Sequence, residues 1–315
     1  MVMINTLAEY VDDCVEGIYR LSQIKSETGP HGQSKMVATL EDCSGKIVCY
    51  GWKFNSHASC SSRSNLYSCV LYIKENGEEI SAELLSVKPA DNINESSIQF
   101  LPYSALPIPK TATELQALIE QCPIISLRQF MNSVFLDKEI TLAFLKLPAS
   151  REHHHAYPGG LAQHSLEVVA IVQRSLWQVT EDEFWLSTAA ALLHDIGKIK
   201  VFKTSGDRTN SGFILDHDLL TLEILAVPLS QFDKSWPDGA IALRYLLTKS
   251  PKIRRPLMPC ALAINYADKM SSAQTTKIHA FNQKPKWQRF AKLNAKGPAS
   301  LFWRPSSSNT FQGVR

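Results

Sequence analysis

Two absences in this sequence narrow the class of protein. No apolar run approaches the roughly 20 residues that a membrane-spanning helix needs, so we expect no membrane partner. The first ten residues also lack the charged-then-apolar pattern of a secretory leader. Together these absences predict a cytoplasmic protein.

Paired cysteines are also lacking. The seven cysteines include no CxxC pair. Their odd number and irregular spacing argue against a disulfide framework and against a four-cysteine zinc site. We therefore expect reduced thiols, most of them buried.

Acidic residues are missing from one end of the chain. Residues 269–315 hold nine Lys and Arg and no Asp or Glu. Because the net charge is +3, the first 268 residues carry 24 basic against 30 acidic residues, a charge of −6. An acidic body with a basic tail predicts a polyanionic partner.

Residues 1–90 read as a small β domain. Segments of roughly alternating hydrophobicity are separated by turn residues such as Glu75-Asn76-Gly77. Five strands fit best to an oligonucleotide-binding (OB)-like barrel. The expected strands are 15–25, 35–40, 46–54, 66–73 and 80–87.

The rest of the chain reads as a proline-rich linker, a helical domain and a tail. Four prolines interrupt 89–111, so we place the linker at 91–112, the helical domain at 113–275 and the tail at 276–315. The predicted fold class is α+β and multidomain, with the barrel followed by an all-α domain. The expected helices are 113–121, 125–135, 138–147, 160–177, 181–199, 216–229, 240–247 and 259–272.

Histidine and aspartate converge on the expected helices. His164 shares a helix face with apolar residues, and the apolar segment 184–193 runs directly into His194-Asp195-Ile196-Gly197-Lys198. An ionised Asp at the end of a buried helix costs several kcal/mol unless a cation compensates it. A divalent metal would do so, and imidazole with carboxylate suits Mn, Fe, Co, Ni or Zn better than Ca.

This pattern resembles the HD superfamily of metal-dependent phosphohydrolases, whose fold is all-helical. The resemblance implies metal ligands at His164, at the adjacent pair His194-Asp195 and at the distal helical Asp268. Lys198 would neutralise substrate phosphate, and His154 or His155 would bind phosphate or protonate the leaving oxygen. A further ligand is expected from His217 or His153. The His-His pair of two-metal members is missing from 243–256, so one or two ions remain open.

Two subfamilies are closer. Leu147-Pro148-Ala149-Ser150, the triple histidine 153–155 and Tyr157-Pro158-Gly159-Gly160 look like the MobH-type conjugative relaxase domain. The layout of an OB-like barrel before an HD domain is similar to the YhaM-type 3′–5′ exoribonucleases. Either resemblance implies a nucleic-acid substrate.

Aromatic and basic residues mark candidate nucleic-acid surfaces, because single-strand binders combine stacking platforms with cations. On the barrel the candidates are Tyr50, Trp52 and Lys53, with Val48, Tyr50 and Trp52 on the strand face opposite Cys49. In the tail, 284–296 predicts a basic amphipathic helix that binds nucleic acid or docks on the protein or a partner. The tail candidates are Lys284, Lys286, Trp287 and Arg289.

The leading prediction is a metal-dependent phosphodiesterase that acts on single-stranded RNA or DNA as a 3′–5′ exonuclease, with Mn, Fe, Co, Ni or Mg as its ion. The alternatives are a relaxase-like DNA nickase or conjugation accessory protein, and a nucleic-acid-binding module with a degenerate HD site. A nucleotide phosphohydrolase would leave the barrel and the basic tail without a role. A homo-oligomer is left open.

Overall fold

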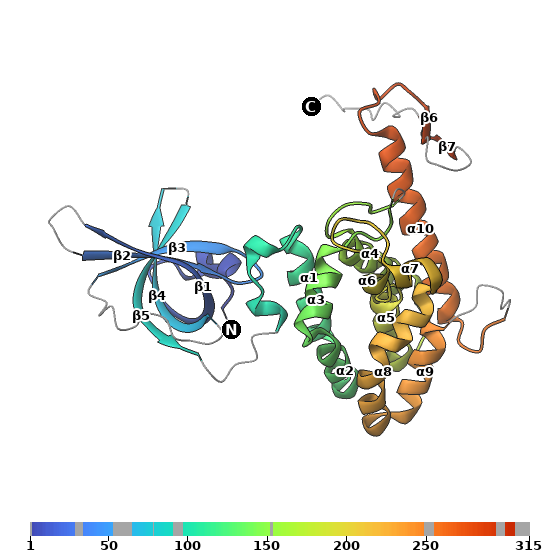
Figure 1. Ribbon diagram of the computed structural model, residues 1–315, viewed down its shortest axis with the longest axis horizontal. Helices are drawn as coiled ribbons and strands as arrows, with labels where there is room; N and C mark the ends of the chain where they lie inside the picture. The colour runs from blue at the N-terminus through green and yellow to red at the C-terminus, as the bar shows by residue number, and fades with distance from the viewer. Residues whose placement is uncertain are drawn as a thin grey trace, which may run out of the picture. The chain divides into compact units, whose positions relative to one another are not determined.

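The computed structural model describes residues 2–28, 34–52, 65–77, 79–90, 97–151, 154–248, 255–293 and 300–305. The chain divides into two compact units, Met1–Lys146 with Ile224–Ile241, and Leu147–Glu223 with Ala242–Arg315. A β-barrel is followed along the chain by helices, which confirms the predicted fold class (Figure 1). No helix in the described part of the chain is both long and apolar enough to cross a bilayer.

Five strands close into a barrel in the order β1-β2-β3-β5-β4. Their neighbours pair antiparallel except β3 and β5, which pair in parallel. Each of the five predicted strands is present, although residues 53 and 54 of the predicted third strand lie outside the described residues. Their bounds are β1 Cys14–Thr28, β2 Ser34–Glu41, β3 Lys46–Trp52, β4 Leu66–Asn76 and β5 Glu79–Pro89.

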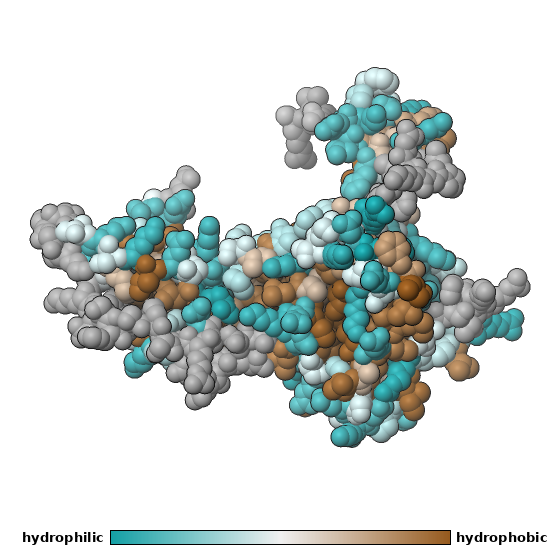
Figure 2. Space-filling view, in the orientation of Figure 1, coloured by the Kyte–Doolittle hydropathy of each residue, from teal (hydrophilic) through white to brown (hydrophobic). Residues whose placement is uncertain are grey.

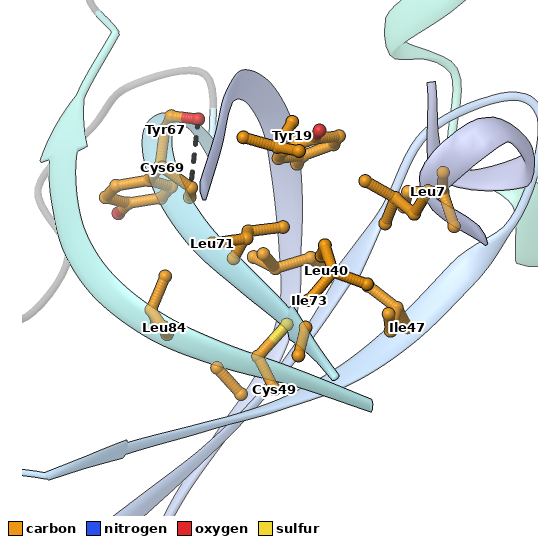
Figure 3. Close-up of a cluster of buried hydrophobic side chains, with 14 residues drawn as sticks. Leu7, Tyr19, Leu40, Ile47, Cys49, Tyr67, Cys69, Leu71, Ile73 and Leu84 are labelled. Atoms are coloured by element: carbon orange, nitrogen blue, oxygen red, sulfur yellow. Dashed lines mark hydrogen bonds between the residues drawn. The ribbon is translucent and has the colours of Figure 1, made fainter. Parts of the chain in front are cut away.

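The barrel interior is a core of side chains from alternate positions of the strands. Tyr19, Leu40 and Leu71 are fully buried there and point toward one another (Figure 3). Gly17 leaves room for the ring of Tyr19, because a Cβ at position 17 would overlap that ring. Among the described residues the interior is therefore filled by side chains.

The helical part follows the predicted elements closely. The expected helix at 125–135 coincides with α2, and Thr180 begins α5 with a capping box to Glu183. The bounds are α1 Pro109–Gln121, α2 Ile125–Phe135, α3 Lys138–Lys146, α4 Gly160–Ser175, α5 Glu181–Leu193, α6 Lys198–Val201, α7 Asn210–Ile214, α8 His217–Ser235, α9 Pro237–Leu247 and α10 Cys260–Phe281, with short 3-10 turns at Ile4–Tyr10, Ile98–Phe100 and Tyr103–Ala105.

The predicted single helix at 181–199 is wrong, because α5 ends at Leu193 and tight turns lead into α6. Ile196 and Lys198 donate to carbonyls only three residues back. The N–H of Gly197 donates outside the helix, to Thr221 Oγ1 at 3.0 Å. A Cβ on Gly197 would overlap the carbonyl oxygen of His217, so only glycine lets the start of α8 approach this closely.

The tail helix predicted at 284–296 is also wrong. Phe290–Leu293 forms strand β6, which pairs antiparallel with β7, Ser300–Trp303, in a hairpin beyond the end of α10 (Figure 1). The Arg304 guanidinium fastens this segment by donating to the carbonyl oxygens of Pro285 at 2.6 Å and Gln288 at 3.0 Å. Pairing with the next strand of the hairpin overrides the local helical pattern.

Candidate metal centre

Four predicted metal ligands meet within the second unit. His164 lies on α4, Asp268 on α10, and His194 and Asp195 in the turn that follows α5. One ligand atom from each lies within 4.8 Å of all the others, so the cluster could hold a metal ion. The two histidines and Asp195 are buried, whereas Asp268 is half-buried. Tight turns after α5 aim both His194 and Asp195 at the same point.

Carboxylate oxygens surround the Nε2 atoms of both histidines. His164 Nε2 lies 3.4 Å from Asp195 Oδ2 and 3.2 Å from Asp268 Oδ1. His194 Nε2 lies 3.4 Å and 3.9 Å from the same two oxygens. Neither Nε2 atom makes a bond of acceptable geometry, so within the described residues both are buried without a hydrogen-bond partner.

The other ring nitrogen of each histidine is already engaged. His194 Nδ1 lies 2.8 Å from the carbonyl oxygen of Ala191, which only accepts, so Nδ1 carries the proton. His164 Nδ1 lies 3.1 Å from Ser271 Oγ, whose own proton goes to Glu167. Each Nε2 is thereby left with a lone pair that faces carboxylate oxygens. This donor set repels itself without a cation and fits a divalent metal.

The charged groups of the cluster shift one another's pKa values. Burial would raise the pKa of Asp195, but the cation of Lys198 holds that pKa well below its usual value. Burial would likewise raise the pKa of Asp268, and the neighbouring His164 lowers it. Burial would lower the pKa of His164, yet the two carboxylates raise it. The two carboxylates thus favour positive charge at His164 Nε2, where a metal ion competes with a proton.

Lys198 and His217 flank Asp195. Lys198 Nζ contacts Asp195 Oδ2 at 2.6 Å, and His217 Nε2 contacts Oδ1 of the same carboxylate at 3.2 Å. Hydrogen bonding to Asp195 raises the pKa of His217. The two oxygens of one carboxylate therefore face different histidines, because Gly197 admits the start of α8.

The predicted catalytic histidines separate into different environments. The ring centroids of His154 and His164 lie 5.4 Å apart with the rings tilted, and burial, followed by the charge of Lys198, lowers the pKa of His154 to about 4. His155 is buried at a left-handed φ of 48°, and Gly160 carries no Cβ that would overlap its carbonyl. His153 lies outside the described residues.

A buried polar network stands behind His164, and sequence reasoning missed most of it. His155 Nδ1 lies 2.8 Å from Tyr157 Oη, and His155 Nε2 lies 3.0 Å from Thr275 Oγ1 and 3.1 Å from Glu167 Oε2. Ser271 joins this network to His164. A signal existed, because Ser271 and Thr275 follow Asp268 at helical spacing on a mostly apolar helix.

The nucleic-acid candidates lie in two separate places. Tyr50 is half-exposed on the outer face of the barrel beside exposed Val48, and Lys35 Nζ lies 3.7 Å from the Tyr50 ring centroid. Trp52 ends β3, but its side chain and Lys53 lie outside the described residues. The four tail candidates are all exposed just before β6: Lys284, Lys286, Trp287 and Arg289.

The comparisons with known proteins give one finding. A family model named TraI_2, described as "Putative helicase", matches residues 113–207. This span holds His164, His194, Asp195 and Lys198, and it ends before His217 and Asp268. No curated protein and no solved structure matches the chain.

Proposed function

We propose that this protein is a metal-dependent phosphodiesterase acting on single-stranded nucleic acid. The observation that carries the proposal is that the buried Nε2 atoms of His164 and His194 face Asp195 and Asp268 and have no hydrogen-bond partner among the described residues. Such a centre is costly to bury unless it serves a cation. It also agrees with the resemblance to HD-type phosphohydrolases.

In this proposal His164, His194, Asp195 and Asp268 hold the ion, and His217 adds a ligand beside the second oxygen of Asp195. A bound divalent ion would polarise a phosphoryl oxygen and lower the pKa of a water. Lys198 neutralises charge that develops on the phosphoryl group. His154, whose ring lies beside that of His164, donates a hydrogen bond to phosphate or to the leaving oxygen. His155 keeps His164 in position through Ser271.

Two surfaces support a nucleic-acid substrate. The hairpin beyond α10 and the segment just before it carry exposed Trp287, Phe290 and Trp303 among basic residues, and Figure 2 shows apolar and hydrophilic residues intermingled there. Arg289 lies over the Trp303 ring at 5.4 Å. Aromatic platforms combined with cations are typical of single-strand binding. The OB-like barrel adds Tyr50, Trp52 and Lys53 as candidates.

Two modes of cleavage follow from the two resemblances. The barrel-plus-helix layout favours stepwise 3′–5′ exonuclease action. The TraI_2 match over 113–207 favours the second candidate, a relaxase-like nickase or an accessory protein of conjugation.

The test is cleavage of 5′-labelled single-stranded RNA and DNA, and of supercoiled plasmid, by the full chain with Mn²⁺ or with EDTA. A metal-dependent ladder lost in Asp195→Ala would support the exonuclease. Site-specific relaxation of plasmid without a ladder would support the nickase. Cleavage that persists in Asp195→Ala, or no cleavage of any substrate, would overturn the phosphodiesterase.

A further inference from the structure

A cavity of about 510 Å³ opens beside the metal centre, within the size range of small-molecule sites. Lys198 and His217 form one side of it, and both side chains contact Asp195. The cavity therefore begins at the cluster where the proposed chemistry takes place. The remaining lining residues are Ala149, Ser150, Arg151, Val201, Phe202, Arg208 and Phe213.

The lining of this cavity is cationic. Arg151, Lys198 and Arg208 contribute positive charge, and no Asp or Glu is among the described residues that line it. Among the described residues, Arg208 makes one side-chain hydrogen bond, from Nη1 to the carbonyl oxygen of Gly212 at 3.1 Å. A guanidinium has five donors in a planar fork, so most of that fork stays available for a phosphate.

An exposed aromatic ring completes the cavity. Phe213 leaves 69% of its surface accessible although it lines the cavity wall. Its short helix, α7, is fixed by Thr209, whose Oγ1 accepts from the N–H of Gly212 at 3.0 Å. A large apolar ring beside phosphate-binding cations suits the stacking of a nucleobase.

A second cavity of about 330 Å³ lies next to the first and shares Ser150 and Arg151 with it. Its other walls include Tyr157 and the polar turn 204–207. Two cavities that share an arginine in their walls match two successive units of a polymer better than a single nucleotide.

We propose that Arg151 and Arg208 bind the phosphates that flank the scissile one, and that Phe213 stacks a base. The substrate is then an oligonucleotide rather than a mononucleotide. This inference rests on the proposed phosphodiesterase function and names the residues that bind its polymeric substrate beside the metal centre.

The experiment measures binding of a fluorescein-labelled trithymidylate to the full chain in EDTA, so that no cleavage interferes. Arg151→Ala and Phe213→Ala should each weaken binding about tenfold. Arg151→Ala should also reduce the salt dependence of binding by about 0.7 in log–log slope, the value for one lost phosphate contact. Arg151→Lys, which keeps the charge but loses the fork, should fall between Arg151→Ala and the wild type.

Matched controls come from the same unit. Arg174→Ala removes an exposed arginine far along α4, and Ile214→Ala removes the exposed neighbour of Phe213 that does not line the cavity. Both should bind the probe as the wild type does. Unlabelled pTpT should displace the probe at a lower concentration than thymidine monophosphate.

Equal binding by Arg151→Ala and Arg174→Ala, equal competition by the monophosphate, or no binding of the probe to the wild type would each overturn this inference. The proposed function has a separate readout, hydrolysis of bis(p-nitrophenyl) phosphate by the wild type with Mn²⁺. Its absence would overturn the phosphodiesterase while the binding assay still decided whether the cavity takes an oligonucleotide.

Discussion

The imidazole of His194 donates from Nδ1 to the carbonyl oxygen of Ala191 at 2.8 Å, and this bond decides which nitrogen faces the cluster. Ser271 Oγ fixes His164 in the same way, by accepting from its Nδ1 at 3.1 Å. Both rings are therefore held in the tautomer that a metal ion requires.

Ser271→Ala should weaken metal binding. The substitution removes the acceptor of His164 Nδ1 and a donor to Glu167, so the ring loses its fixed orientation. Loss of such an outer partner typically costs about 10–100-fold in metal affinity. Titration of the EDTA-treated protein with Mn²⁺ measures the change. Ser272→Ala, at the neighbouring half-buried position, should bind Mn²⁺ normally, and equal affinities in the two variants would contradict the role given to Ser271.

Gly197→Ala should lower stability and disturb the centre together. The new Cβ would overlap the backbone of α8 at His217, and forced overpacking typically costs about 1–3 kcal/mol. Thermal unfolding and Mn²⁺ affinity are the two readouts. Lys200→Ala, which breaks only an exposed pair with Glu223, should change stability by about 0–1 kcal/mol. An unchanged Tm in Gly197→Ala would show that α8 does not need this close approach.

The sequence was sufficient for most elements and for the first ligands. Periodicity and capping marked α2 and α5, and alternating hydrophobicity with turn residues marked the barrel strands. The adjacent pair His194-Asp195 stood out because a charged residue at the end of an apolar helix needs compensation.

Other features depended on contacts that no local pattern encodes. His155 faces the buried network only because its backbone takes a left-handed conformation and Gly160 lets it pack closely. Strand β6 forms because β7 pairs with it, and Arg304 holds the segment before β6 by donating to the carbonyl oxygen of Gln288. Ser271 and Thr275 resemble ordinary polar helix residues until α10 is packed against α4.

Glu167→Gln should destabilise the protein at neutral pH and have little effect in acid. Burial would raise the pKa of Glu167, but His155 and Ser271 lower it below its usual value of 4.5. A depressed pKa stabilises the fold above the unfolded value, and this stability is lost as pH falls through the folded pKa. The gap in Tm between the variant and the wild type should narrow below about pH 4.5. Two results would contradict the ionised role of Glu167. One is a difference in Tm that does not change with pH, and the other is a difference no larger than Glu181→Gln produces at an exposed position.

Double substitution Trp287→Ala and Trp303→Ala should weaken binding of a long single-stranded oligonucleotide. Each stacked base contributes about 1–3 kcal/mol, so loss of even one stacking ring lowers affinity about fivefold or more. Fluorescence anisotropy in EDTA measures the change. Trp177→Ala removes a tryptophan that is 83% exposed but lies outside the hairpin, and it should bind as the wild type does. If the double variant and Trp177→Ala lost the same affinity, the hairpin would not be part of the nucleic-acid-binding surface.

The most direct test of the central claim is calorimetric titration of the EDTA-treated full chain with Mn²⁺. We expect saturable binding in the wild type and in His279→Gln, whose exposed histidine lies near the end of α10. We expect binding to be lost in His164→Gln and His194→Gln, since each removes a lone pair that faces the carboxylates. Unchanged Mn²⁺ affinity in both of these variants would contradict the account.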